Sequence, residues 1–85
     1  METEWHPAKN EANKAKHGLD FATFKGWDAE PVVIEDDRYD YGETRLIALG
    51  RINGAPYAVV YTMRGEVMRL ISFRRAHEEE IARHE

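Results

Sequence analysis

Arginine supplies all the positive charge in the second half of the chain. Residues 44–75 contain six Arg, no Lys and a single acid, Glu66, and so carry a net charge of +5. The preceding block, residues 26–43, carries a net charge of −6. The guanidinium group has a planar fork that binds a phosphate through two hydrogen bonds. The basic block therefore indicates either a phosphate-binding surface or solvated strand edges that happen to carry Arg.

Arg69 is the most informative of these residues. It interrupts an otherwise apolar run, Val67–Ile71, where a guanidinium is costly unless it is paired or faces a wet cleft. Two interpretations stay open at this point: an internal ion pair with Glu35 or Asp36, or a cradle for a phosphate group.

RNA offers a reaction that such a surface could catalyse without a metal ion. Its own 2′-OH can attack the adjacent phosphate. The protein then has to stabilise the developing charge, accept the proton of the 2′-OH and protonate the leaving 5′-oxygen. Arg, His, Lys and Tyr can fill these roles. Our catalytic candidates are Arg69, Arg74, Arg75, Arg64 and His17, and our RNA-binding candidates are Lys16, Arg45 and Tyr61.

Each candidate also has a simpler interpretation. Arg64 could simply suit a tight turn, and His17 could simply close the first helix, where a cation favours the helix dipole. Tyr61 could be a core residue rather than a platform for stacking an RNA base.

Other chemistries have less support in the sequence. The chain has no Cys, and His77 and His84 are about 10 Å apart along a helix, too far for one zinc ion. Ser72 is the only serine and lies outside any GxSxG motif. A catalytic pair of carboxylates stays open, although most acids cluster in one predicted loop. We therefore expect no metal site and no cofactor.

The elements that must position these residues begin with a helix. The 85 residues fit one domain, 1–85. Pro7 suits a first helical position and Gly18 suits the residue after the last, which predicts a helix between them. Alanines at i, i+4 and i+7 form a narrow apolar stripe that we expect to pack on a sheet. The stripe consists of Ala8, Ala12 and Ala15.

The next segment predicts one short helix and one extended run. Asp20 is placed to cap a short helix that carries Phe21 and Phe24. An extended run, Val32–Ile34, follows. The acidic segment Glu35–Glu43 then predicts a solvated loop.

Three strands of an antiparallel meander come next, and we predict them at Arg45–Arg51, Tyr57–Met63 and Glu66–Phe73. Asn53–Gly54 is the favoured pair for a type I′ turn, and Arg64–Gly65 predicts a second tight turn.

These two turns set the expected register and the two faces of the sheet. The first turn places Ile52 opposite Ala55 and Ala48 opposite Val59, and the second places Thr62 opposite Val67. A one-residue slip would exchange the faces. The expected faces carry Leu46, Ala48, Val59, Tyr61, Met68 and Leu70 on one side, and Arg45, Ile47, Leu49, Ala58, Val60, Arg69, Ile71 and Phe73 on the other.

The tail, Ala76–Glu85, predicts a short helix whose only large apolar residue is Ile81. We expect this helix to dock weakly or to need a partner. The order of elements predicts an α+β fold, in which N-terminal helices pack on a four-stranded antiparallel sheet and a short helix ends the chain.

Four motifs that follow one another in the chain resemble those of the BrnT toxin family. They cover nearly the whole chain, and their order makes the resemblance specific. They are Trp5–Asn10 with Asn13 and Lys16–Phe21, then Glu35–Arg45, then Ile47–Arg51 with Val60–Thr62, and finally Arg69–Ala76.

The resemblance implies a RelE-like fold and a ribonuclease that halts translation. It also implies an antitoxin, BrnA, with a ribbon-helix-helix region, and a toxin–antitoxin complex that represses its own operon. Two positions depart from the family pattern: His6 stands where Asp usually follows Trp, and His84 where Tyr usually precedes the final Glu.

Charge and hydropathy limit where the protein acts and what it binds. No apolar run approaches the about 20 residues that span a bilayer, and Met1–Trp5 lacks the features of a signal peptide, so we expect a cytoplasmic protein.

We expect an acidic antitoxin to cover Arg69 or Arg74–Arg75. The acidic segment Glu35–Glu43 would repel DNA, so operator DNA is expected to bind the antitoxin. The alternative function is a non-catalytic module that acts through its partner.

Overall fold

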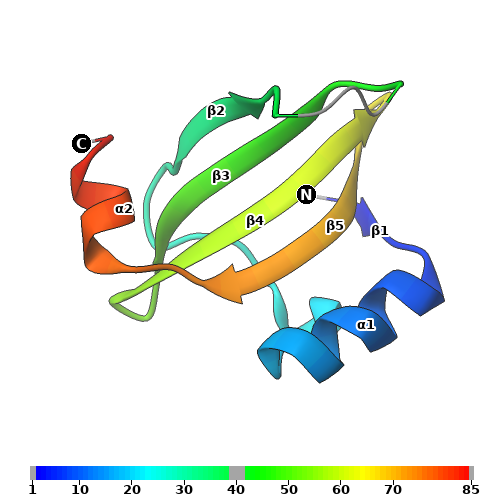
Figure 1. Ribbon diagram of the computed structural model, residues 1–85, viewed down its shortest axis with the longest axis horizontal. Helices are drawn as coiled ribbons and strands as arrows, with labels where there is room; N and C mark the ends of the chain where they lie inside the picture. Colours follow the sequence, from blue (N-terminus) through cyan, green and yellow to red (C-terminus); the bar gives the residue numbers. More distant parts are fainter. Residues whose placement is uncertain (1, 39–41, 85) are drawn as a thin grey trace.

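The chain forms an α+β fold, as predicted, with one mixed sheet of five strands (Figure 1). We analysed a computed structural model that describes residues 2–38 and 42–84. The predicted acidic loop therefore extends over residues outside the described part, Tyr39 to Tyr41. The strands are β1 (Thr3–Glu4), β2 (Val32–Asp36), β3 (Arg45–Ile52), β4 (Ala55–Arg64) and β5 (Val67–Arg75), and the helices are α1 (Pro7–His17), the 3-10 turn η1 (Phe21–Thr23) and α2 (Glu78–Ala82).

The sheet order is β1-β5-β4-β3-β2, so the expectation of four antiparallel strands is wrong at one edge. There β1 pairs in parallel with β5, which sets Thr3 opposite Met68 and Glu4 opposite Arg69. A strand of two residues has no periodicity that a sequence pattern could reveal. It forms because the backbone groups along the edge of β5 need hydrogen-bond partners.

The first hairpin agrees with its prediction. Asn53 and Gly54 have positive φ angles of 52° and 82°, as a type I′ turn requires, and Ala48 lies opposite Val59. In the second hairpin the turn falls one residue later, at Gly65 and Glu66.

The predicted register of that second hairpin is therefore wrong. Arg64 lies opposite Val67, and Thr62 lies opposite Arg69 instead of Val67. The positive φ of 62° at Gly65 fits the first position of a type II′ turn, which explains why the turn starts at this glycine.

A β-bulge in β5 decides which side chains share a face. Tyr61 lies opposite Leu70, whereas Val60 lies opposite Ser72, so Ile71 is the extra residue. The bulge brings Leu70 and Phe73 into one core cluster, although strict alternation would separate them. The expectation that Phe73 shares a face with Arg69 is wrong for this reason.

The two faces of the sheet are covered differently. One face carries the main core, formed by Phe21, Phe24, Val59, Met68, Leu70 and Phe73. The other face is covered at one end by α2, whose Ile81 is buried against Leu49 and Ala58. The predicted anchor of the C-terminal helix therefore has its partner within the chain. The candidate site lies on the part of this second face that α2 does not cover.

The bounds of α1 agree with the prediction, but its buried face does not. Pro7 is the first helical residue, and Gly18 ends the helix in the left-handed conformation with φ 72°. His6 caps the helix, since its Nδ1 accepts a hydrogen bond of 3.1 Å from the backbone N of Ala8. Asp, the residue expected at this position from the resemblance to the BrnT family, is likewise a favoured cap. The predicted alanine stripe is wrong: its members are exposed, and the buried residues of α1 are Asn10 and Asn13.

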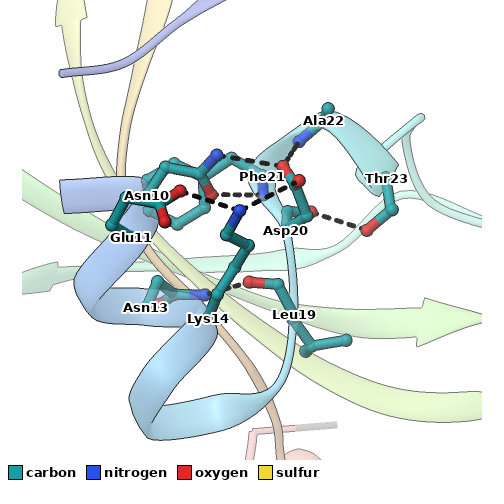
Figure 2. A network of polar contacts seen from close by, with 9 residues as sticks. All are labelled: Asn10, Glu11, Asn13, Lys14, Leu19, Asp20, Phe21, Ala22 and Thr23. Carbon is teal, nitrogen blue, oxygen red and sulfur yellow. Dashed lines mark hydrogen bonds and ion pairs between the residues drawn. The ribbon is translucent and has the colours of Figure 1, made fainter. Parts of the chain in front are cut away.

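Asn13 joins α1 to the edge of β5. Its Nδ2 donates to the backbone O of Phe73 at 2.8 Å, and its Oδ1 accepts from the backbone N of Phe73 at 3.0 Å. The side-chain amide thus takes the place of a neighbouring strand where β1 has ended. The same Nδ2 donates to the backbone O of Leu19 at 2.9 Å, which holds the chain as it leaves the helix (Figure 2).

Asn10 and Asp20 complete this junction (Figure 2). Asn10 Oδ1 accepts from the backbone N of Phe21 at 2.9 Å, and Asn10 Nδ2 donates to Asp20 Oδ1 at 3.0 Å. Asp20 also caps η1 as predicted, because it accepts from the backbone N of Ala22. Hydrogen bonds from two asparagines therefore tie α1 to the core.

Asn13→Ala should lower the free energy of unfolding by about 2–4 kcal/mol, because it leaves buried backbone groups of Phe73 without partners. Urea unfolding followed by circular dichroism measures the change. Lys9→Ala, an exposed change on the same helix, should stay within about 0.5 kcal/mol of the unchanged chain. Equal stability of the two variants would contradict this role of Asn13.

Candidate functional site

A hollow of about 350 Å³ opens on the sheet face that α2 leaves uncovered. Its floor is apolar and its rim is charged. The end of α1 forms one wall, and the end of β2 forms the opposite rim. We call it the central hollow. Its lining consists of Lys16, His17, Asp36, Arg38, Arg45, Ile47, Val60, Ile71, Ser72 and Arg74.

The central hollow brings together four of the predicted site residues. His17 and Lys16 come from the last turn of α1, Arg45 from the start of β3 and Arg74 from the end of β5. These residues are distant in sequence, and the Asn13 contact between α1 and β5 sets their relative positions. Arg69 lies along the same face but lines an adjoining pocket.

Three other predicted residues lie elsewhere. Arg75 follows Arg74 but projects to the opposite face, where its guanidinium carbon lies 5.2 Å from the centre of the Tyr57 ring. Tyr61 packs against the main core, and burial raises the pKa of its hydroxyl. Arg64 lies at the exposed β4–β5 turn and lines a separate hollow.

Arg74 is held by Glu80 of α2. Its Nη1 and Nη2 donate to the two carboxylate oxygens at 3.1 and 2.9 Å. Nη1 also donates to the backbone O of Arg75 at 3.2 Å. A guanidinium has five N–H donors. In the described chain, these contacts leave donors of Arg74 available to an anion in the central hollow.

Glu80 is charged over the whole physiological range. The hydrogen bonds from Arg74 lower the pKa of this carboxyl from 4.5 to about 2, and a hydrogen bond from the backbone N of His77 acts in the same direction. The bond from His77 also closes the first turn of α2. Glu80 thus links the short helix to Arg74.

Arg69 has an internal partner, but not one of those predicted. Its Nη1 donates to Glu4 Oε2 at 3.0 Å, because the parallel pairing of β1 with β5 sets these two residues opposite one another. The side chains stay 25% and 41% exposed. The pair is therefore partly solvated, and Arg69 remains accessible from the adjoining pocket.

The acidic segment contributes a lining residue that the sequence did not place in the site. Asp36, expected in a solvated loop, ends β2 and has a side chain only 1% exposed. Its carboxylate accepts from Arg38 Nε at 2.8 Å and from Arg38 Nη2 at 3.0 Å. The signal was the Asp-x-Arg spacing directly after the predicted extended run, Val32–Ile34.

The surroundings of His17 favour its neutral imidazole. Burial lowers the pKa of its imidazole below the ordinary value of 6.5, and the charges of Lys16 and Arg74 lower it further. A neutral imidazole can accept a proton. The alternative in which His17 stabilises the helix end as a cation finds no support in this shift.

Metal ligands do not gather in the described part of the chain: no three His, Asp or Glu side chains there could hold an ion together. His84, one of the two departures from the family pattern, is exposed in the last turn. It does not line the central hollow.

The fold and site define a small α+β protein in which an open sheet face carries a hollow lined by three arginines and a histidine. The sequence pattern of one family, described as the ribonuclease toxin BrnT of type II toxin-antitoxin systems, matches residues 5–80. The chain therefore belongs to the BrnT family. No curated protein matches the chain. No helix in the part that the structure describes is long and apolar enough to cross a membrane.

Glu80→Gln should remove the acid sensitivity that the Arg74–Glu80 pair confers. A carboxyl group whose pKa is lower in the folded chain stabilises the fold above its ordinary pKa, and this contribution is lost as the pH falls. The difference in unfolding free energy between the unchanged chain and Glu80→Gln should therefore shrink as the pH falls from 4.5 toward about 2.

Urea unfolding at several pH values measures this difference. Glu79→Gln removes the same charge from an exposed site on the same helix and serves as the control. A pH dependence shared by both variants would show that the pair makes no specific contribution.

Proposed function

We propose that this chain is a metal-independent RNA endonuclease that inhibits translation. The observation that carries the proposal is that His17, whose imidazole pKa is lowered by burial, lines the same hollow as Arg74 in a member of a ribonuclease toxin family. An RNA phosphate is the anion that this combination of a proton acceptor and a bidentate cation fits best.

The proposed reaction uses the RNA, side chains of the central hollow and a water molecule. His17 accepts the proton of the 2′-OH as the 2′-oxygen forms a bond to the adjacent phosphorus. Arg74, Arg45 and Lys16 stabilise the charge that develops on the phosphate oxygens. The bond from phosphorus to the 5′-oxygen breaks, and the leaving oxygen takes a proton from water in the open hollow. The hydroxide formed in this way then removes the proton from His17, which restores the neutral base. The products are a 2′,3′-cyclic phosphate and a 5′-hydroxyl.

A type II toxin has an antitoxin, and we propose a BrnA-like protein with a ribbon-helix-helix region for this chain. Acidic side chains of that partner would replace the internal carboxylates at Arg69 and Arg74 and so cover the site. Operator DNA would bind the antitoxin alone. We further propose a cytoplasmic, RelE-like toxin in which residues 1–85 act as one domain.

A second function is favoured by the pairing of the arginines in the central hollow and the adjoining pocket. Arg38, Arg45, Arg69 and Arg74 each contact a carboxylate of this chain, which leaves little net charge at the site. A non-catalytic or attenuated module that acts only through its partner complex would tolerate this neutrality. Intact RNA after incubation with the chain, with or without ribosomes, would support this second function.

Arg74→Ala should slow RNA cleavage by about 100-fold to 1,000-fold, the usual cost of losing one contact to a developing oxyanion. Arg75→Ala is the matched control, since it removes the same charge one residue away on the opposite face. Cleavage is followed on labelled RNA in EDTA, and melting curves establish that both variants fold. Equal losses in both variants would contradict a phosphate contact through Arg74.

The rate of cleavage should rise with pH to a plateau, and the midpoint of this rise should lie below pH 6.5. The reason is that His17 must be neutral to accept the proton and that its pKa is lowered. His17→Gln should remove this midpoint and most of the activity. His84→Gln, at an exposed position outside the central hollow, should leave the profile unchanged. A midpoint that persists in His17→Gln would assign the base to another group.

A further inference from the structure

A second cavity adjoins the central hollow, between the first turns of α1 and the start of β5. It has a volume of about 430 Å³, within the range of pockets that hold small ligands. We call it the α1–β5 pocket. Arg45 and Ile71 line both cavities, so a chain molecule that places one group in the central hollow can place its neighbouring group here.

The wall of this pocket uses the alanines that the helix leaves exposed. Ala8 and Ala12 lie one turn apart on α1, and both line the pocket together with Ile71. Small apolar side chains at this spacing leave room beside the helix. An apolar wall suits the face of a planar ring, which water solvates poorly.

Arg69 and Glu43 supply opposite hydrogen-bonding groups in the same pocket. Glu4 holds Arg69 through Nη1 at 3.0 Å and orients the guanidinium, which keeps further donors. Glu43 contributes a carboxylate, which can only accept, and it lies 3.5 Å from Arg45 Nε. The pocket therefore pairs a forked donor with an acceptor.

Guanine is the nucleobase that complements this pair. Its O6 and N7 are two neighbouring acceptors that match an arginine fork, and its amino group is a donor for a carboxylate. Adenine and cytosine present an amino group where guanine presents O6, and this group would meet the donors of Arg69 instead of an acceptor.

We propose that the α1–β5 pocket binds a guanine base next to the cleaved phosphate, with Arg69 contacting O6 and N7 and Glu43 contacting the amino group. This inference rests on the proposed function, because it takes RNA as the substrate. It gives Arg69 a role in specificity instead of the catalytic role expected from the sequence.

The test measures binding of the four nucleoside 3′-monophosphates to the full chain by NMR titration. Guanosine 3′-monophosphate should bind about tenfold to 100-fold more tightly than the other three. Arg69→Lys and Glu43→Gln should each remove this preference. Arg74→Ala should weaken all four ligands alike and keep the preference, because it acts on the phosphate.

Glu35→Gln is the matched control for Glu43→Gln, since it removes the same charge from an exposed position on β2. Melting curves establish that each variant folds. Equal binding of the four nucleotides, or no measurable binding of any, would overturn the pocket.

The two proposals fail in distinguishable ways. RNA cleavage without enrichment of guanine beside the cut, read by sequencing the fragments, would reject the guanine pocket and keep the ribonuclease. A guanine preference in binding without any cleavage would keep the pocket and reject the proposed catalysis.

Discussion

The contact between Asn13 and the backbone of Phe73 is the constraint on which the site depends. Strand β5 lies next to the sheet edge, and β1 covers only the start of it. Beyond that point, one buried side-chain amide satisfies both the N–H and the C=O of Phe73. Because this amide belongs to α1, meeting the hydrogen-bonding need of the strand also fixes the helix one turn before His17. The histidine is thus placed near Arg74, whose charge helps to lower its pKa.

The bulge at Ile71 is the second constraint. Arg69 and Arg74 are separated by an odd number of positions, and a regular strand would direct them to opposite faces. The extra residue changes the alternation, so that Leu70 and Phe73 share the core and both arginines border cavities on the other face. Arg75 returns to the core side, over Tyr57. Burial of two large side chains therefore selects which arginines border the two cavities.

The carboxylates that pair with the arginines have two opposite effects on ligand binding. The contacts of Arg69 with Glu4 and of Arg74 with Glu80 order two flexible side chains before any ligand arrives, which reduces the entropy that binding must overcome. The same contacts compete with an incoming anion for the guanidinium donors. Under the proposed function, an acidic antitoxin segment and an RNA phosphate would both have to displace these carboxylates from the arginines.

The sequence by itself determined the features that depend on neighbouring residues: the bounds of α1 from Pro7 and Gly18, the turn at Asn53–Gly54, the α+β class and the resemblance to the BrnT family. Local backbone preferences suffice for each turn and helix end. Only the tertiary structure decided β1, the bulge, the burial of Asp36 and the partners of the arginines. These depend on pairings such as that of Arg69 with Glu4, which are 65 residues apart, and on which backbone groups the sheet leaves unpaired. A local sequence pattern does not predict these pairings, because their free energy depends on contacts between distant residues that form only in the complete fold.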